Sequence, residues 1–249
     1  MDTAKPYWTG FTGFNFVAYG NRDSSNYLER YNIPEAQTCV RGTLRYAGFP
    51  PFIKTLVDIG FLDDQPKDFL SEAIPWNEAL AKVAGAKSSS EDDIVAAISA
   101  KATTFKTAEV KSQLIKDLKW LGIFSTTKIT PRGNPLDTLC ATLEDKMTFQ
   151  EGERDMVFLQ HMFEVENKDG SKNTISSTLC EYGAPIGSGG PSAMAKLVGI
   201  PGAVAVQQVL NGTISERGVL APMNTKLNTP IMKELDEKYG IKCTEKILN

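Results

Sequence analysis

Near the start of the chain, hydrophobic and polar positions follow the period of two that is typical of β-strands. Residues 14–19 are aromatic and β-branched and end at Gly20. Residues 38–46 alternate as a half-buried strand does. The polar, turn-rich residues 21–36 lie between them. We therefore expect residues 1–46 to form mainly strands.

Residues 47–148 change to a helical period. Proline favours the first turn of a helix, serine and asparagine favour the N-cap, and glycine favours the end. These signals predict helices from Pro50-Pro51 to Gly60, over 92–100 after Ser90, over 110–121 before Gly122, and over 136–147 after Asn134-Pro135. We expect an all-helical lobe.

Strand patterns return in the last part of the chain. They predict a strand over 156–165, a hairpin turn at Asp169-Gly170 and a return strand over 174–182. A glycine-rich loop, a helix over 192–210 and an amphipathic helix near 230–239 follow.

This order of elements predicts an α+β or mixed α/β fold. We expect a mixed β-sheet domain, made from residues 1–46 plus 149–249, with an all-helical domain, 47–148, inserted into it. The early and late strands are expected to share one sheet, with a ligand cleft at the boundary with the helical lobe.

Composition narrows the class of partner. The chain has 249 residues and a formal net charge of -3, with no basic stripe, so we expect no nucleic acid. The uncharged run 182–195 is rich in Gly, Pro and Ser, so we expect no membrane span there. Residues 1–7 lack the apolar core of a secretory signal, and the four cysteines form no CxxC pair. A cytoplasmic protein without a metal site is expected.

Arginines are scarce and gather early in the chain. Four of the seven, Arg22, Arg30, Arg41 and Arg45, fall within 24 residues. Arginine grips carboxylates or phosphates through a planar fork of donors, and Arg41 and Arg45 share one face of a strand. The cluster predicts either a pocket for a polyanionic small molecule or ordinary surface ion pairs with neighbouring acids.

Two further features are ambiguous. Gly187, Gly189 and Ser192 imitate a dinucleotide-binding GxGxxG with its third glycine lost, a weak signal. Free N–H groups at the start of the following helix could instead receive a substrate carboxylate, or the loop could be a hinge. His161, the sole histidine, has no marked nucleophile or acid beside it, so a structural role is favoured.

Several stretches together resemble a known family. They include Asn21-Arg22-Asp23-Ser24, Arg41-Gly42-Thr43-Leu44-Arg45-Tyr46, Lys128-Ile129-Thr130-Pro131-Arg132-Gly133-Asn134, Leu159-Gln160-His161 and Gly218-Val219-Leu220-Ala221-Pro222. With these motifs the chain resembles, over essentially all its length, the C-terminal half of the fungal saccharopine reductases. These are also called NADP-dependent, L-glutamate-forming saccharopine dehydrogenases.

The resemblance implies an oxidoreductase of lysine biosynthesis. Such enzymes join α-aminoadipate semialdehyde and glutamate as an imine and reduce it with NADPH to saccharopine. The family's NADP-binding Rossmann domain would precede residue 1, so no cofactor-binding residue is expected here and the chain alone should be inactive. A homodimer is a further possibility.

The resemblance also places the substrate contacts on Arg22, Thr43, Leu44 and Arg45. Saccharopine bears three carboxylates, which suits arginine forks. No catalytic acid or base is identified. Two alternatives stay open: a portion of a related dicarboxylic amino-acid dehydrogenase, or a non-catalytic binding or dimerisation module.

Overall fold

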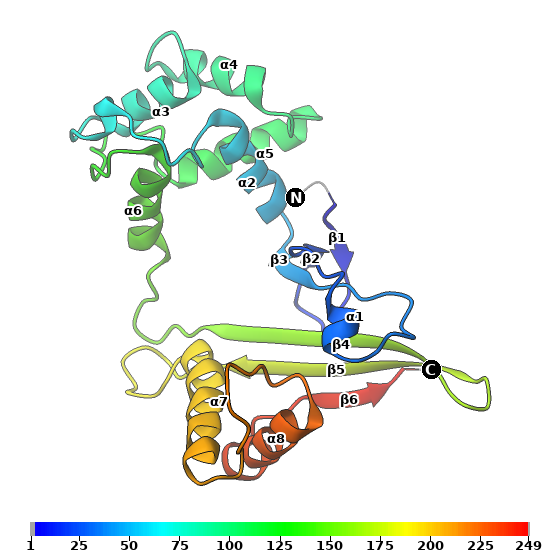
Figure 1. The fold of residues 1–249 in the computed structure, drawn as a ribbon. Helices are drawn as coiled ribbons and strands as arrows, with labels where there is room; N and C mark the ends of the chain where they lie inside the picture. The colour runs from blue at the N-terminus through cyan, green and yellow to red at the C-terminus, as the bar shows by residue number, and fades with distance from the viewer. Residues whose placement is uncertain (1–2, 249) are drawn as a thin grey trace. The chain divides into compact units, whose positions relative to one another are not determined.

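The computed structural model describes residues 3–248, which divide into two compact units. The first unit comprises the chain as far as Arg22 together with Val40–Thr148, and the second comprises Asp23–Cys39 and the chain from Phe149 onward. Each unit holds one three-stranded sheet and its own helices (Figure 1). This arrangement confirms the α+β class, while the predicted domain boundaries stay a prediction.

The sheet of the first unit is antiparallel, in the order β1-β2-β3. Its strands are β1 (Lys5–Tyr7), β2 (Phe16–Gly20) and β3 (Gly42–Tyr46). The strand predicted over 14–19 is confirmed as β2. The strand predicted over 38–46 is shorter, because only its last five residues pair with β2.

Helices make up the rest of the first unit. They are α2 (Phe49–Ile59), the short 3-10 helix η1 (Asp68–Leu70), α3 (Trp76–Ala84), α4 (Glu91–Lys101), α5 (Ala108–Trp120) and α6 (Pro135–Met147). The predicted caps are confirmed, since Ser90 accepts from the backbone N–H of Asp93 and Asn134 from that of Asp137. The apolar faces meet in one core that includes Leu56, Leu80 and Ile98.

The second unit is built on a long hairpin. Its elements are α1 (Tyr27–Arg30), β4 (Met156–Glu166), β5 (Lys172–Tyr182), α7 (Ala193–Leu210), α8 (Thr225–Tyr239) and β6 (Thr244–Ile247), and the sheet runs β4-β5-β6. The predicted turn is confirmed: Gly170 has a φ of 82°, and the Asp169 carboxylate accepts from the backbone N–H of Ser171 at 2.9 Å.

The expectation of one shared sheet is wrong for the described strands. Early and late strands form two separate sheets, and every strand pair in both is antiparallel. The reason is local pairing: β4 and β5 face each other along all 11 residues through their hairpin, and β6 adds to β5. Periodicity predicts that a segment is a strand but not which strand it pairs with.

Candidate functional site

Strand β3 places two of the predicted substrate contacts side by side. In the register with β2, Thr43 lies opposite Tyr19 and Arg45 lies opposite Val17. Because successive side chains in a strand alternate between faces, Thr43 and Arg45 share one face of the sheet. Leu44 lies opposite Ala18 on the other face, so the structure does not bring it to the same surface.

The guanidinium of Arg45 is held by groups that leave its charge uncompensated. It lies over the ring of Phe49, 5.4 Å from the ring centre, and its Nη1 donates to the carbonyl of Leu44 at 2.8 Å. No carboxylate of residues 3–248 forms an ion pair with it. An exposed guanidinium in this setting retains donors for an acidic ligand.

Arg22 lies just past the end of the same strand pair. The ladder continues beyond Gly20, because the backbone N–H of Asn21 donates to the carbonyl of Arg41 at 2.9 Å. Arg22 then turns the chain with a φ of 58°, in the left-handed region that few non-glycine residues adopt. Such conformations gather at ligand sites, where the surroundings fix them.

Arg45 thus lies within β3, and Arg22 lies just past the end of β2, so the two arginines are separated along the direction of the strands. Arg45 is about five strand positions from the level of Arg22, roughly 17 Å at the usual rise per residue. Arg41 continues the line of Thr43 and Arg45 beyond the strand. The spacing of Arg22 and Arg45 suits a long ligand with acidic groups at its ends better than a compact anion. The roles of Arg22, Thr43, Leu44 and Arg45 in binding stay a prediction.

The glycine-rich loop does not offer the open helix N-terminus that the sequence suggested. The Asp155 carboxylate accepts from the backbone N–H of Ala193 through Oδ1 at 2.7 Å and from that of Met194 through Oδ2 at 2.9 Å. The Ser192 hydroxyl accepts from the N–H of Ala195 at 3.0 Å. The expectation of N–H groups waiting for a substrate carboxylate is wrong, because the chain's own side chains already bind them.

This cap also fixes the electrostatics of the loop. The hydrogen bonds from Met194 and Ala193 lower the pKa of Asp155 below its usual value, so it stays ionised at neutral pH. A Cβ on Gly183 would overlap the Asp155 carboxylate and lie 2.6 Å from the nitrogen of Ala193. The loop is therefore a tight junction with a negative charge at its centre. No local pattern in the sequence marks Asp155 as a cap, because the helix that it caps begins 38 residues later.

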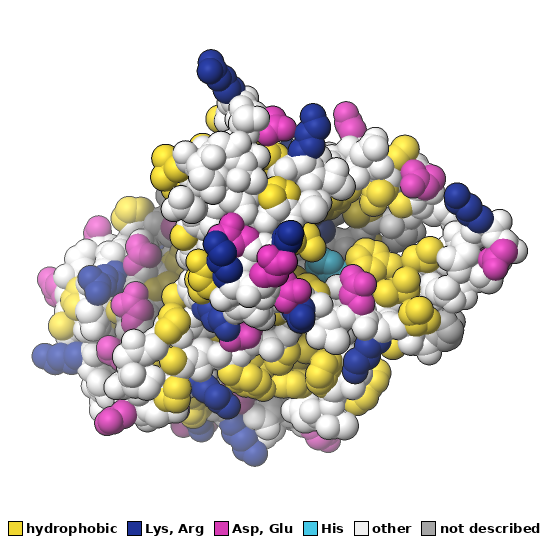
Figure 2. All heavy atoms as spheres, turned by 90° about the horizontal axis from the view of Figure 1, so that it is seen from below, with side chains coloured by type: hydrophobic (Ala, Val, Ile, Leu, Met, Phe, Trp, Pro, Cys, Tyr) yellow, Lys and Arg dark blue, Asp and Glu magenta, His cyan; other side chains and the backbone are white. Residues whose placement is uncertain are grey.

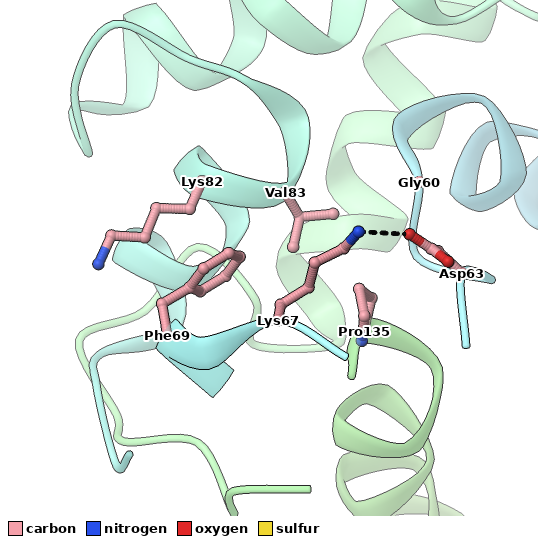
Figure 3. Close-up of a pocket in the computed structure, with 7 residues that line it drawn as sticks. All are labelled: Gly60, Asp63, Lys67, Phe69, Lys82, Val83 and Pro135. Carbon is pink, nitrogen blue, oxygen red and sulfur yellow. Dashed lines mark ion pairs between the residues drawn. The ribbon is translucent and has the colours of Figure 1, made fainter. Parts of the chain in front are cut away.

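The helices of the first unit enclose a small hollow of about 240 Å³ (Figure 3). The Lys67 ammonium points to Asp63, at 2.9 Å. Lys82 pairs with Glu78 at 2.7 Å and lies over the ring of Phe69. Both cations at this hollow are thus already compensated, and their ammonium groups point apart (Figure 3). The hollow lacks the converging charges of an anion site.

His161 is exposed on β4, where it lies opposite Ser177. Its ring and that of Phe163 form a T-shaped pair, with ring centres 5.9 Å apart. Within residues 3–248, no group of three or more His, Cys, Asp and Glu side chains is arranged to hold a metal ion. Nothing in this geometry gives His161 a catalytic neighbour.

Comparison with known proteins gives a consistent picture. Residues 1–241 match the family model described as "Saccharopine dehydrogenase C-terminal domain". The chain is 67% identical over 248 residues to the saccharopine dehydrogenase [NADP(+), L-glutamate-forming] of Pyricularia oryzae, and 52% identical over 246 residues to that of Saccharomyces cerevisiae. These alignments cover 100% and 99% of this chain, and 55% and 54% of those proteins.

A more distant relative and a solved structure extend the comparison. The mitochondrial alpha-aminoadipic semialdehyde synthase of Bos taurus is 31% identical over 228 residues, which are 90% of this chain and 24% of that protein. The solved apo saccharopine dehydrogenase (L-Glu forming) from Saccharomyces cerevisiae superposes with a TM-score of 0.90 at 51% identity. That match covers 100% of this chain and 55% of the solved chain.

Proposed function

The chain belongs to the saccharopine dehydrogenase C-terminal domain family, and we propose that it is the substrate-binding and helical portion of an NADP-dependent, L-glutamate-forming saccharopine dehydrogenase. In this proposal the whole enzyme reduces the imine of α-aminoadipate semialdehyde and glutamate to saccharopine, in lysine biosynthesis. The chain spans about half the length of the curated relatives that it matches, so the activity belongs to a longer protein.

One observation carries the proposal: the chain is 67% identical to the Pyricularia oryzae enzyme along its whole length. The arginine-bearing sheet supports it independently. Saccharopine carries three carboxylates, and the first unit presents Arg22 and Arg45 without carboxylate partners in the described residues. Thr43, on the same face as Arg45, adds a hydroxyl donor.

In this reading the sheet binds and orients the substrate. Arg45, steadied by the ring of Phe49, holds one carboxylate, and Arg22 holds another at the end of the strand pair. Fixing both ends of a flexible ligand positions the bond between them for reaction. Leu44, on the opposite face, would support β3 from behind. No acid or base is assigned among these residues.

The glycine-rich loop does not fit NADP. A dinucleotide pyrophosphate needs free N–H groups at a helix N-terminus, and here the ionised Asp155 already binds them. We therefore place NADP on the part of the full-length enzyme outside residues 1–249. When bound, the cofactor supplies the hydride.

Steady-state kinetics of the full-length enzyme test the proposal. We expect NADP⁺ reduction that depends on saccharopine and releases glutamate, and no such activity from residues 1–249 alone. Measuring kcat/KM for a panel of other dicarboxylic secondary amines distinguishes a saccharopine dehydrogenase from a related dehydrogenase. The related enzyme would use another amine of the panel more efficiently than saccharopine. Absence of turnover with every amine would favour the non-catalytic module. The cytoplasmic location and the homodimer stay predictions.

A further inference from the structure

Helix α7 has an outer face that no described residue of the second unit covers. Its inner side packs within the unit, with Val204 and Gln208 buried. On the outer side Val198 is 64% exposed and Val206 is 60% exposed. The other large apolar side chains exposed on this helix are Met194, Val209 and Leu210. This outer face, called here the α7 face, follows a helical spacing along the whole helix.

The α7 face differs from the surface of an ordinary outer helix. It carries no charged residue. The single ionisable side chain of α7 is Lys196, which points to β5 and forms an ion pair with Glu181 at 2.6 Å. Small residues, Gly199, Gly202 and Ala203, are exposed in its middle and leave room for another backbone to approach. A helix that is apolar on all sides normally lies inside a larger core or a membrane.

The neighbouring helix shows what a solvent face looks like in this unit. On α8 the exposed side is charged, with Lys233 facing Glu237 and Lys238 paired with Glu234 at 2.7 Å. Gln208 of α7 donates to the Pro230 carbonyl at 3.0 Å and to Glu234 at 2.8 Å. The pair of helices therefore has one charged side, on α8, and one apolar side, on α7.

A lipid bilayer is a poorer match than protein for this face. In the described chain α7 is the one helix long and apolar enough, by length and composition, to cross a membrane. Most of α7 lies in the uncharged run 197–215, which is longer than the Gly-, Pro- and Ser-rich run 182–195. The polar bonds of Gln208 and Lys196 along the inner side, however, tie α7 to α8 and to β5, so lipid could not surround it.

We propose that the α7 face is the docking surface for the rest of the full-length protein, the part that carries NADP in the proposed function. The match covers 55% of the solved relative's chain, and in this proposal the part that corresponds to the remainder covers the α7 face. An apolar helix between two layers of one polypeptide is a usual component of a layered α/β core. The inference rests on the proposed function in one respect: the part of the full-length protein that covers the α7 face is taken to be the part that binds NADP.

Site-specific photo-crosslinking in the full-length protein tests the docking. A benzophenone amino acid replaces Val198, and the matched control replaces Lys233, which lies on the charged side of α8. Mixed isotope labels distinguish bonds within one chain from bonds between two copies. We expect Val198 to cross-link within its own chain to residues outside the 249, and the control to give no such product. Cross-links to a second copy, to the first unit or to nothing would each overturn the proposal.

Thiol labelling gives a second readout that tolerates smaller substitutions. In the native full-length protein, Val206→Cys should react with a bulky maleimide at least tenfold more slowly than Lys233→Cys, as read from the labelled peptides by mass spectrometry. Equal rates would show an open face and overturn the proposal. Saccharopine-dependent NADP⁺ reduction is measured on the same samples: activity with an open face would refute the docking alone, and a protected face without activity would refute the proposed function alone.

Discussion

The Asp155 carboxylate and the backbone N–H of Ala193 form a 2.7 Å hydrogen bond across 38 residues of sequence. The bond joins the residue before β4 to the start of α7. Gly183, which follows β5, lies so close to both residues that a Cβ there would contact them. Through this junction, the sheet of the second unit fixes the direction in which α7 leaves. The junction thus sets where the α7 face points.

Replacing Asp155 should weaken the second unit. Asp155→Ala leaves the N–H groups of Ala193 and Met194 without acceptors and removes a negative charge at the positive end of a helix. We expect the Tm of the full-length protein to fall by a few degrees, and by less for Asp155→Asn, which retains one acceptor oxygen. Ser188→Ala, in the same loop, is the control. An unchanged Tm for Asp155→Ala would contradict the structural role.

The same carboxylate predicts a pH dependence of stability. Its folded pKa lies below the usual 3.8, so its contribution is fully present above about pH 4 and is lost as the pH falls through the lowered value. The difference in free energy of unfolding between the wild type and Asp155→Asn should therefore shrink between neutral pH and about pH 3. Urea denaturation of both proteins at the two pH values measures it. A difference independent of pH would show that the charge of Asp155 contributes nothing.

Gly183 should tolerate no side chain. In Gly183→Ala the new Cβ would overlap Asp155 and come within 2.6 Å of the Ala193 nitrogen, so the junction must open. We expect a loss of about 1–3 kcal/mol in the free energy of unfolding, as for other overpacked sites. Gly20→Ala is the matched control, because a Cβ there meets nothing within 4 Å. Chemical denaturation of the two variants should separate them clearly, and equal stabilities would rule out the steric argument.

Local signals in the sequence were enough to predict many single elements. Ser90 and Asn134 mark helix starts because their side chains cap the N–H groups three residues on. Asp169-Gly170 marks the hairpin because glycine adopts the positive φ that the turn requires. Helix α3 was missed because Pro75 replaces the usual polar cap, and β1 was missed because three residues carry too little periodicity.

Relationships between distant residues could not be predicted in the same way. The Asp155 cap and the separation of the two sheets depend on which segments meet in space, and neither leaves a local pattern. For the candidate site, strand alternation puts Thr43 and Arg45 on one face, whereas Arg41 lies just before β3 and its predicted face stays a prediction. The family resemblance was needed to single out Arg22 and Arg45. The left-handed conformation of Arg22 has no signal in the sequence, because arginine rarely adopts it.

Arg45 should contribute strongly to the affinity for substrate. In the full-length enzyme, Arg45→Ala should raise the KM for saccharopine at least tenfold, because losing a charge-assisted contact costs about 2–3 kcal/mol. Arg45→Lys should have an intermediate effect, since it retains the charge but loses the fork. Arg132→Ala is the control, because it removes an exposed arginine that lies outside the sheet, and it should leave KM unchanged. A KM unchanged by Arg45→Ala would remove this residue from the site.

Arg22 offers a way to separate binding from folding. Its φ of 58° is strained for arginine but ordinary for glycine, so Arg22→Gly relieves strain while it removes the guanidinium. We expect the free energy of unfolding to stay level or rise by up to about 1 kcal/mol, while the KM for saccharopine rises about tenfold. Asn32→Gly, at the other positive φ of a non-glycine residue in the described chain, is the matched control and should leave KM unchanged. A purely structural role would predict the same stability for Arg22→Gly but an unaltered KM, and that result would remove Arg22 from the binding site.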